Sequence, residues 1–453
     1  MPVLKNAVAA VLGRRDEYKQ AEAYYEGEVP EVFATARLRA AIKATSDGGK
    51  LNYLRPVVDA VNNRMEISSI TGGTKAANAK IAEVWANNEL DLEAKEIHLR
   101  VLTMGDAYAI VWPDEDGVLQ VAYNSPFTTS IVYDPENPRR KLMAVKMWAQ
   151  DDKTTRLNVY TDTAVDKYRA ASKDTVSEKT NWEHIGTDEN PFDEIPVFHF
   201  RTHRPFGRAE HKSGYDAQNA INKSFITNMY TMDYLGAPQR YALSTMGSEG
   251  EIEDFEEGSS ERENLKGLKS GPGELWYLQG VNSDGQFEAA DSTQFWNPIM
   301  NTVRALASLT DTPLHYFEKT LTPSGNALRV AEAPLLKKVA DREASFGATW
   351  RELFKFILKA EGIKTDVQVF WKAIESLDEL ERWDLILKKI NAGLSHRQAL
   401  REGGYSDEQI EKIMAERDLE AEAGSFYQRK PEVRVSTTEN DTLPLQADET
   451  TGK

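Results

Sequence analysis

Residues 323–362, PSGNALRVAEAPLLKKVADREASFGATWRELFKFILKAEG, decide the fold that the sequence predicts. One helical face of this stretch collects large apolar side chains, at Leu328, Leu335, Val339, Phe346, Trp350, Leu353 and Ile357. Ser324 can cap the start of the helix, and Gly362 can end it. These limits predict a helix of about 50 Å, kinked at Pro334. A strut of that length is typical of a large assembly and unusual in the core of an enzyme.

Composition and charge exclude several classes of protein. The chain has 453 residues and no cysteine, which excludes disulfides, thiolate catalysis and cysteine-ligated zinc. No apolar run approaches the roughly 18 residues of a membrane span, and Met1 to Val11 lacks the features of a signal peptide, so we expect a cytosolic origin and no membrane contact. The formal net charge of -17 argues against general affinity for nucleic acid. A loose, non-adhesive contact with DNA remains possible.

The N-terminal half of the chain predicts an α+β fold. Helical periodicity covers much of Met1 to Lys43 and of Leu51 to Arg64. Strand-like runs then follow one another without intervening helices: Ala107–Val111, Val118–Tyr123, Thr129–Val132, Leu142–Trp148 and Leu157–Tyr160. Such an order favours antiparallel sheets over a repeated βαβ unit.

Two further helices enclose an insert. The first, Gly214–Leu235, has an uncharged polar face rich in asparagine, which solvent exposure and contact between repeated copies explain equally well. The second covers residues 292–309. The insert between them has strand-like pieces at Arg240–Leu243 and Leu275–Gln279, and eight carboxylates from Glu249 to Glu263. An acidic run of this kind is typical of a solvated loop.

The C-terminal region predicts a strand and three short helices. The strand is Val367–Trp371, and the helices start at three capping boxes, Ser376 with Glu379, Ser395 with Gln398 and Ser406 with Gln409. The helices extend to about Ala423. Beyond Tyr427 the chain is polar, which predicts disorder.

A search for reactive groups predicts no catalytic residue, metal ligand or cofactor. Gly72 to Lys75 has letters of a phosphate-binding loop without its spacing, so we interpret it as a turn. His199 and His203 have the spacing of metal ligands on a helix, but Val197–Phe200 predicts a strand, which favours structural or surface roles for both. From chemistry alone the chain is a soluble acidic α+β protein.

Six short motifs occur in a collinear order that is more specific than any one of them. They are YKQAEAYYEG (Tyr18–Gly27), LNYLRPVVD (Leu51–Asp59), GDAY (Gly105–Tyr108), GR (Gly207–Arg208), APQR (Ala237–Arg240) and SGNAL (Ser324–Leu328). In this order the chain resembles the portal proteins of tailed bacteriophages, in particular the group related to the portal of the Bacillus phage SPP1. The resemblance extends from about Tyr18 to Ala423, with one departure at Ala209, where many relatives would have serine.

The resemblance implies a structural protein without catalytic residues. Identical subunits, twelve in the expected ring, would surround a channel at one capsid vertex through which double-stranded DNA enters and leaves. The terminase large subunit and the head-tail adaptor would dock on the ring, and major capsid and scaffolding proteins would surround it. We therefore expect the protein in the virion, and in the host cytoplasm during assembly.

The resemblance also divides the chain into parts with expected roles. These are a mixed α/β wing (1–213), a stem helix (214–236), a β-containing clip (237–291), a second stem helix (292–309), a tunnel loop (310–323), a long kinked wing helix (324–365), a helical crown (366–425) and a disordered tail (426–453).

Candidate functional residues follow from this division. The tunnel loop would offer Asp311, Thr312, His315, Tyr316, Glu318, Lys319 and Thr320 to DNA. Its apolar residues also allow the simpler interpretation that the loop packs under its neighbour. Lys223 and Arg304 are candidate channel cations, Pro334 is a candidate hinge, and the clip could present an acidic interface at Glu249, Glu251, Glu253 and Asp254.

Two other functions stay open from the sequence. One is an acidic cytosolic enzyme or enzyme subunit with an unrecognised site. The other is an internal adaptor that binds head proteins and has no channel.

Overall fold

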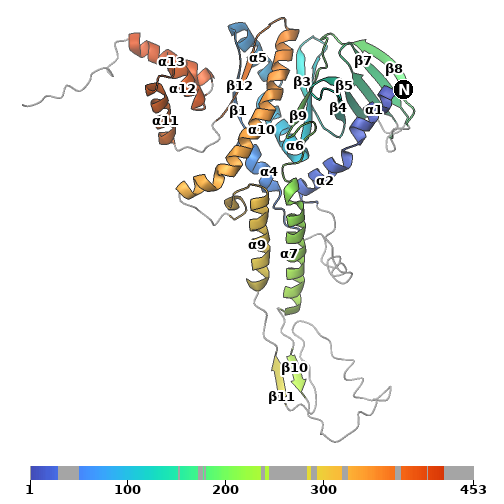
Figure 1. The fold of residues 1–453 in the computed structure, drawn as a ribbon, viewed down its shortest axis with the longest axis vertical. Coiled ribbons are helices and arrows are strands. Elements are labelled where there is room, and N and C mark those ends of the chain that lie inside the picture. Colours follow the sequence, from blue (N-terminus) through green and yellow to red (C-terminus); the bar gives the residue numbers. More distant parts are fainter. Residues whose placement is uncertain are drawn as a thin grey trace, which may run out of the picture. The chain divides into compact units, whose positions relative to one another are not determined.

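The computed structural model describes residues 2–28, 50–150, 154–171, 177, 180–235, 240–243, 283–286, 293–318, 325–372, 379–405 and 407–422. The chain divides into two units, Met1–Leu377 and Asp378–Lys453, each of which is described by itself (Figure 1).

Two antiparallel sheets dominate the first unit. One has the order β3-β2-β9, from Leu119–Asn124, Asp106–Pro113 and Val197–Arg201. The other runs β4-β5-β6-β7-β8, from Thr129–Tyr133, Lys141–Ala149, Thr155–Tyr160, Ala164–Ala170 and Glu183–Glu189. The α+β class and all five strands expected between residues 107 and 160 are thus confirmed. The sequence missed β7 and β8; β8 is almost wholly exposed, so it carries no apolar alternation.

Helices complete the first unit. They are α1 (Pro2–Leu12), α2 (Arg15–Glu26), α4 (Arg55–Asn62), α5 (Lys75–Asn87), α6 (Leu90–Met104), α7 (Tyr215–Leu235), α9 (Thr293–Leu309) and α10 (Gly325–Ala360). α1 packs on the five-stranded sheet, where Ala7, Val8 and Val11 join a core with Val145 and Leu157.

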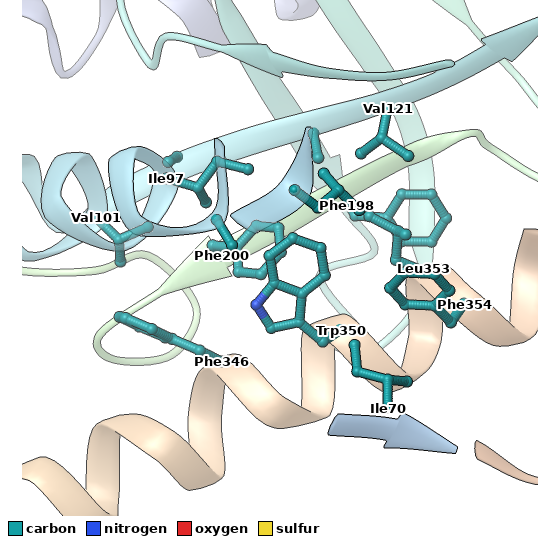
Figure 2. Packing of buried hydrophobic residues seen from close by; sticks show 14 of the residues in the cluster. Ile70, Ile97, Val101, Val121, Phe198, Phe200, Phe346, Trp350, Leu353 and Phe354 are labelled. Carbon is teal, nitrogen blue, oxygen red and sulfur yellow. The ribbon is translucent and has the colours of Figure 1, made fainter. Parts of the chain in front are cut away.

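The long helix α10 supplies the middle of the main core. Figure 2 shows Trp350 of α10 beside Phe198 and Phe200 of β9, with Ile97 of α6 on the far side. The apolar face expected for this helix is confirmed from Leu335 onward, since every later member of that face is buried. Leu328 is only half-buried, so the turns before Pro334 contribute little to the core.

A small sheet joins segments far apart in the sequence. β1 (Ile67–Gly72) pairs antiparallel with β12 (Val367–Trp371), so the strand expected near residue 367 is confirmed and lies in the first unit. After β1, Thr74 caps α5 by accepting a hydrogen bond from the Ala77 amide at 3.2 Å. The turn expected at Gly72 to Lys75 is confirmed.

α7 and α9 lie side by side and antiparallel (Figure 1). Ile221 of α7 packs with Ile299, Val303 and Leu306 of α9. The Ser213 hydroxyl, just before α7, donates to the carbonyl of Leu309 at 3.0 Å, so the start of one helix meets the end of the other. Between the helices, β10 (Arg240–Leu243) pairs with β11 (Ser283–Gln286). The strand expected at Leu275–Gln279 lies outside the described residues.

The described residues of the second unit form three short helices, α11 (Glu379–Asn391), α12 (His396–Glu402) and α13 (Asp407–Glu422). Ile386, Ala399, Leu400 and Ile410 form its core. The Ser395 hydroxyl accepts a hydrogen bond from the Gln398 amide at 3.3 Å, as the middle capping box predicts. Ser376 and Ser406 lie outside the described residues. The unit begins at Asp378, later than the expected crown boundary at residue 366.

Candidate functional site

A buried carboxylate connects the N-terminal helices to the sheet and to the segment that leads into α7. Asp106, at the start of β2, is 0% exposed. Its oxygens accept hydrogen bonds from the Tyr18 hydroxyl at 2.9 Å and the Gly207 amide at 2.6 Å, and they pair with the guanidinium of Arg14. Burial alone would raise the pKa of Asp106, but the hydrogen bond from His199 and the charge of Arg14 hold it below its ordinary value.

His199 extends this network. Its Nε2 donates to Asp106 at 2.8 Å, and its Nδ1 therefore accepts from the Tyr133 hydroxyl at 2.8 Å. Burial lowers the pKa of His199, which favours the neutral imidazole that these two bonds require. His203 contacts the Thr202 hydroxyl at 3.1 Å instead. The structural role expected for His199 is confirmed, and the two histidines serve different partners.

Two glycines let the chain segments approach closely. A Cβ on Gly207 would lie 1.8 Å from the carbonyl oxygen of Gly105, a distance that no side chain tolerates. Gly105 itself has φ of 94°, in the region that glycine adopts at least cost. The Asp106 network and these two glycines form what we call the joint.

Side-chain amides of α7 bind the segment that precedes α4. Gln218 accepts from the Tyr53 amide at 2.8 Å and donates to the Leu51 carbonyl at 2.6 Å. Asn222 accepts from the Leu51 amide at 3.0 Å. Both amides are 0% exposed. The polar face of this helix had two interpretations, solvent exposure and contact between repeated copies. Both are wrong for Gln218 and Asn222, because these side chains are buried and their partners lie in the same chain.

A cluster of charged side chains connects the segment before α7 to α10 and to the end of α9. Glu210, just before α7, pairs with Arg342 at 2.7 Å and with Lys338 at 3.3 Å, both on α10. The Lys338 ammonium also donates to the carbonyl of Thr310, just after α9. Burial would raise the pKa of Glu210, and the two cations hold it below its ordinary value. The sequence did not single out these residues, although Lys338 and Arg342 are one turn apart beside the apolar face of α10.

The described part of the expected tunnel loop, residues 310–318, rests on α4 and α10. A short 3₁₀ turn forms at Leu314–Tyr316. The Tyr316 hydroxyl contacts the guanidinium of Arg64, which pairs with Glu332 of α10 at 2.8 Å. His315 lies 3.4 Å from the same Glu332 carboxylate. The loop base is therefore fixed by contacts within its own chain.

The expected DNA-facing residues differ in their accessibility. Asp311 is exposed, with φ of 49°, whereas Thr312 is buried and its hydroxyl donates to the Thr310 carbonyl at 3.2 Å. Thr312 is thus enclosed by its own chain in this conformation. Glu318 is half-buried. Lys319 and Thr320 lie outside the described residues.

The remaining candidates lie on the helices or in the insert. Lys223 of α7 and Arg304 of α9 are exposed, and the Arg304 guanidinium donates to Asn301 at 2.9 Å. Pro334 is exposed within an uninterrupted α10. The acidic residues Glu249, Glu251, Glu253 and Asp254 lie outside the described residues.

The described ranges contain no group of three or more histidine, aspartate or glutamate side chains placed to bind a metal ion. Within those same ranges, no helix is long and apolar enough to span a bilayer.

Comparison with known proteins identifies the family. The sequence profile described as "Phage portal protein, SPP1 Gp6-like" matches residues 6–423. The chain belongs to this family of phage portal proteins. The portal protein of Mycobacterium phage D29 is 21% identical over 444 residues, covering 92% of this chain and 88% of that protein. The resemblance inferred from the sequence is confirmed.

Solved structures with a similar arrangement come from gene transfer agent (GTA) particles. One chain from a virion of a native particle covers 86% of this portal protein and 99% of that chain, with 12% identity and a TM-score of 0.43. A second, from the neck of a native particle computed with C12 symmetry, covers 85% and 99%, with 12% identity and a TM-score of 0.44.

Four of the six motifs that carry the resemblance lie at the joint or beside it. Gly105–Tyr108 and Gly207–Arg208 form the joint itself, Tyr18–Gly27 supplies Tyr18 to Asp106, and Leu51–Asp59 supplies the segment held by Gln218. In this portal protein, these four motifs are far apart in the sequence and meet at one three-dimensional junction.

Proposed function

We propose that this portal protein assembles with identical copies into a closed ring, a dodecamer by the family expectation, at one vertex of the capsid. Double-stranded DNA passes through the ring during packaging and ejection. The observation that carries the proposal is the family match over residues 6–423, because that range includes α7, α9 and α10. The protein acts in the virion, and in the host cytoplasm during assembly, as a structural component.

The stem helices α7 and α9 line the channel. Lys223 and Arg304 are exposed on these helices and can contact phosphates locally. The net charge of -17 keeps the overall attraction weak, so DNA slides instead of binding tightly.

The tunnel loop, residues 310–323, faces DNA from the top of the stem. Asp311 is its exposed described residue, while Arg64 and Glu332 support its base. Deleting Thr312 to Thr320 should impair DNA packaging. A deletion that left both ring assembly and packaging intact would contradict this role.

The clip, residues 237–291, docks the terminase large subunit and the head-tail adaptor. The β10–β11 pair gives this insert a β framework, and Glu249, Glu251, Glu253 and Asp254 are its candidate contact residues. The wing faces the major capsid and scaffolding proteins. Replacing the four acids with glutamine or asparagine should weaken terminase binding in a pull-down, while the ring stays assembled.

Light scattering on the purified protein tests ring formation. A ring has a mass many times the 50.9 kDa of the subunit. A stable monomer that turns over a small molecule would instead favour an enzyme.

A further inference from the structure

A cleft of about 470 Å³ is lined by α10 on one side and β12 on the other. Its α10 wall includes three small residues, Ala340, Ala344 and Gly347, beside Glu343 and Arg351, and its opposite wall includes Val369 and Trp371 of β12. Small side chains on a helix let another backbone approach closely. The cleft is also open along β12, which pairs only with β1 among the described strands. These features fit an extended segment of another chain.

The carboxylate of Glu343 in the lining of the cleft favours a positively charged group in any segment that binds there. One oxygen of its carboxylate is buried and has no hydrogen-bond partner among the described residues. Arg351 is the other charged residue in the lining, but its side chain donates to the Gly347 carbonyl at 3.3 Å and it lies about 12 Å further along the helix axis. An unpaired buried carboxylate costs free energy, so a cation from outside the described chain would be stabilising.

The same helix has a second uncovered region. Ala327, Val330, Ala331 and Pro334 are all exposed, and Val330 is 77% exposed. This apolar surface lies before the core-packed part of α10. Two separate regions of one helix therefore lack a cover within the described chain.

We propose that the cleft between α10 and β12 is an interface between neighbouring subunits, and that a second copy inserts an extended segment whose Lys or Arg pairs with Glu343. The proposal rests on the ring proposed above. In a closed ring of heterologous contacts, each copy presents the cleft once and the complementary segment once. A neighbouring copy therefore supplies one cation to every Glu343.

Cysteine labelling tests the interface, because the natural chain has no cysteine. Ala344→Cys places a thiol in the cleft, and Asp116→Cys places a control thiol at an exposed position in the turn between β2 and β3. Rings and unassembled subunits are separated by gel filtration and treated with a maleimide. We expect Cys at position 344 to react at least about tenfold more slowly in the ring, and Cys at position 116 to react equally in both.

Charge reversal gives a second, independent measurement. Glu343→Lys should reduce the fraction of protein in rings by about tenfold or more, since like charges would meet in the interface. Asp341→Lys makes the same change at an exposed position of α10 and serves as the matched control, while circular dichroism reports whether each variant folds. Rings in which position 344 stays fully reactive, or an unchanged ring fraction for Glu343→Lys, would overturn the interface while leaving the portal ring in place. Absence of any ring in the natural protein would overturn both.

Discussion

Asp106 accounts for much of the connection between parts of the chain that are distant in sequence. Its carboxylate binds Tyr18 and Arg14 near the N-terminus, His199 on β9 and the backbone of Gly207. A group that is buried with this many donors stays ionised and is satisfied only when all of them are in place. The fold at this point depends on one side chain.

Replacing Asp106 with asparagine should destabilise the subunit by about 3–5 kcal/mol, because the substitution removes the negative charge opposite Arg14 and turns one acceptor into a donor. Urea unfolding measures the change. Asp116→Asn, in an exposed turn, is the control and should stay within about 0.5 kcal/mol of the natural protein. A loss below about 1 kcal/mol for Asp106→Asn would show that the network is not structural.

The raised pKa of Glu343 predicts that its contribution to stability depends on pH with the opposite sign to that of Asp106, whose pKa is lowered. Burial raises the pKa of Glu343 to about 7, from an ordinary 4.5. As pH rises from 4.5 to about 7, the Glu343 carboxyl ionises in the unfolded chain while it stays protonated in the folded subunit. The free energy of unfolding of an unassembled subunit therefore falls as pH rises. Glu343→Gln removes this loss. Its thermal midpoint should exceed that of the natural subunit more at about pH 8 than at about pH 5. A difference independent of pH would contradict the raised pKa.

Single polar residues were the part that the sequence predicted least well. The polar face containing Gln218 and Asn222 was evident, but its partners were not, because Leu51 and Tyr53 contribute backbone groups that leave no pattern in the sequence. Asp106 and Glu210 were likewise two acids among many. Their roles depend on tertiary neighbours far along the chain.

At the scale of elements, α7 packs against α9 and also binds the segment before α4. Gln218→Met should cost about 2–5 kcal/mol, because it leaves the Tyr53 amide and the Leu51 carbonyl buried without partners. Chemical denaturation of the purified subunit measures this. Lys223→Ala, on the exposed side of the same helix, is the control and should change the stability by no more than about 0.5 kcal/mol. Equal effects of the two substitutions would contradict the assignment.

Pro334 divides α10 into an exposed first part and a core-packed remainder that begins at Leu335. We predict that it acts as a hinge, since proline removes one helix hydrogen bond and costs about 3 kcal/mol relative to alanine. Pro334→Ala should therefore slow amide hydrogen exchange in residues 327–333. Lys337→Ala, an exposed change one turn later, should leave that exchange unaltered. If Pro334→Ala leaves the rate of amide exchange unchanged, or leaves α10 as bent as before, Pro334 is not a hinge. The description of α10 as one long helix would still hold.

Elements with strong periodicity were predictable from the sequence. The apolar face of α10, the paired helices α7 and α9, and the strands β2 to β6 each follow a regular spacing of large side chains. β8 was missed because nearly all its residues are exposed. β1 was missed because its two large apolar residues, Ile67 and Ile70, do not alternate, and because it pairs with a strand about three hundred positions away. Pairing with a distant strand leaves no local signal.

At the scale of the whole molecule, the order of motifs was more informative than any single site. Residues from widely separated stretches of the chain, from Arg14 to Arg342, meet at the joint and the Glu210 cluster, which together connect α2, α7, α9 and α10. Such a connection can transmit a change at α7 or α9 to the long helix α10. This arrangement suits a conduit.

Negative-stain electron microscopy of the purified assembly shows whether copies of this chain enclose a channel. We expect ring-shaped particles with a central stain-filled hole and rotational symmetry. Monomers, or closed particles with no central hole, would contradict it.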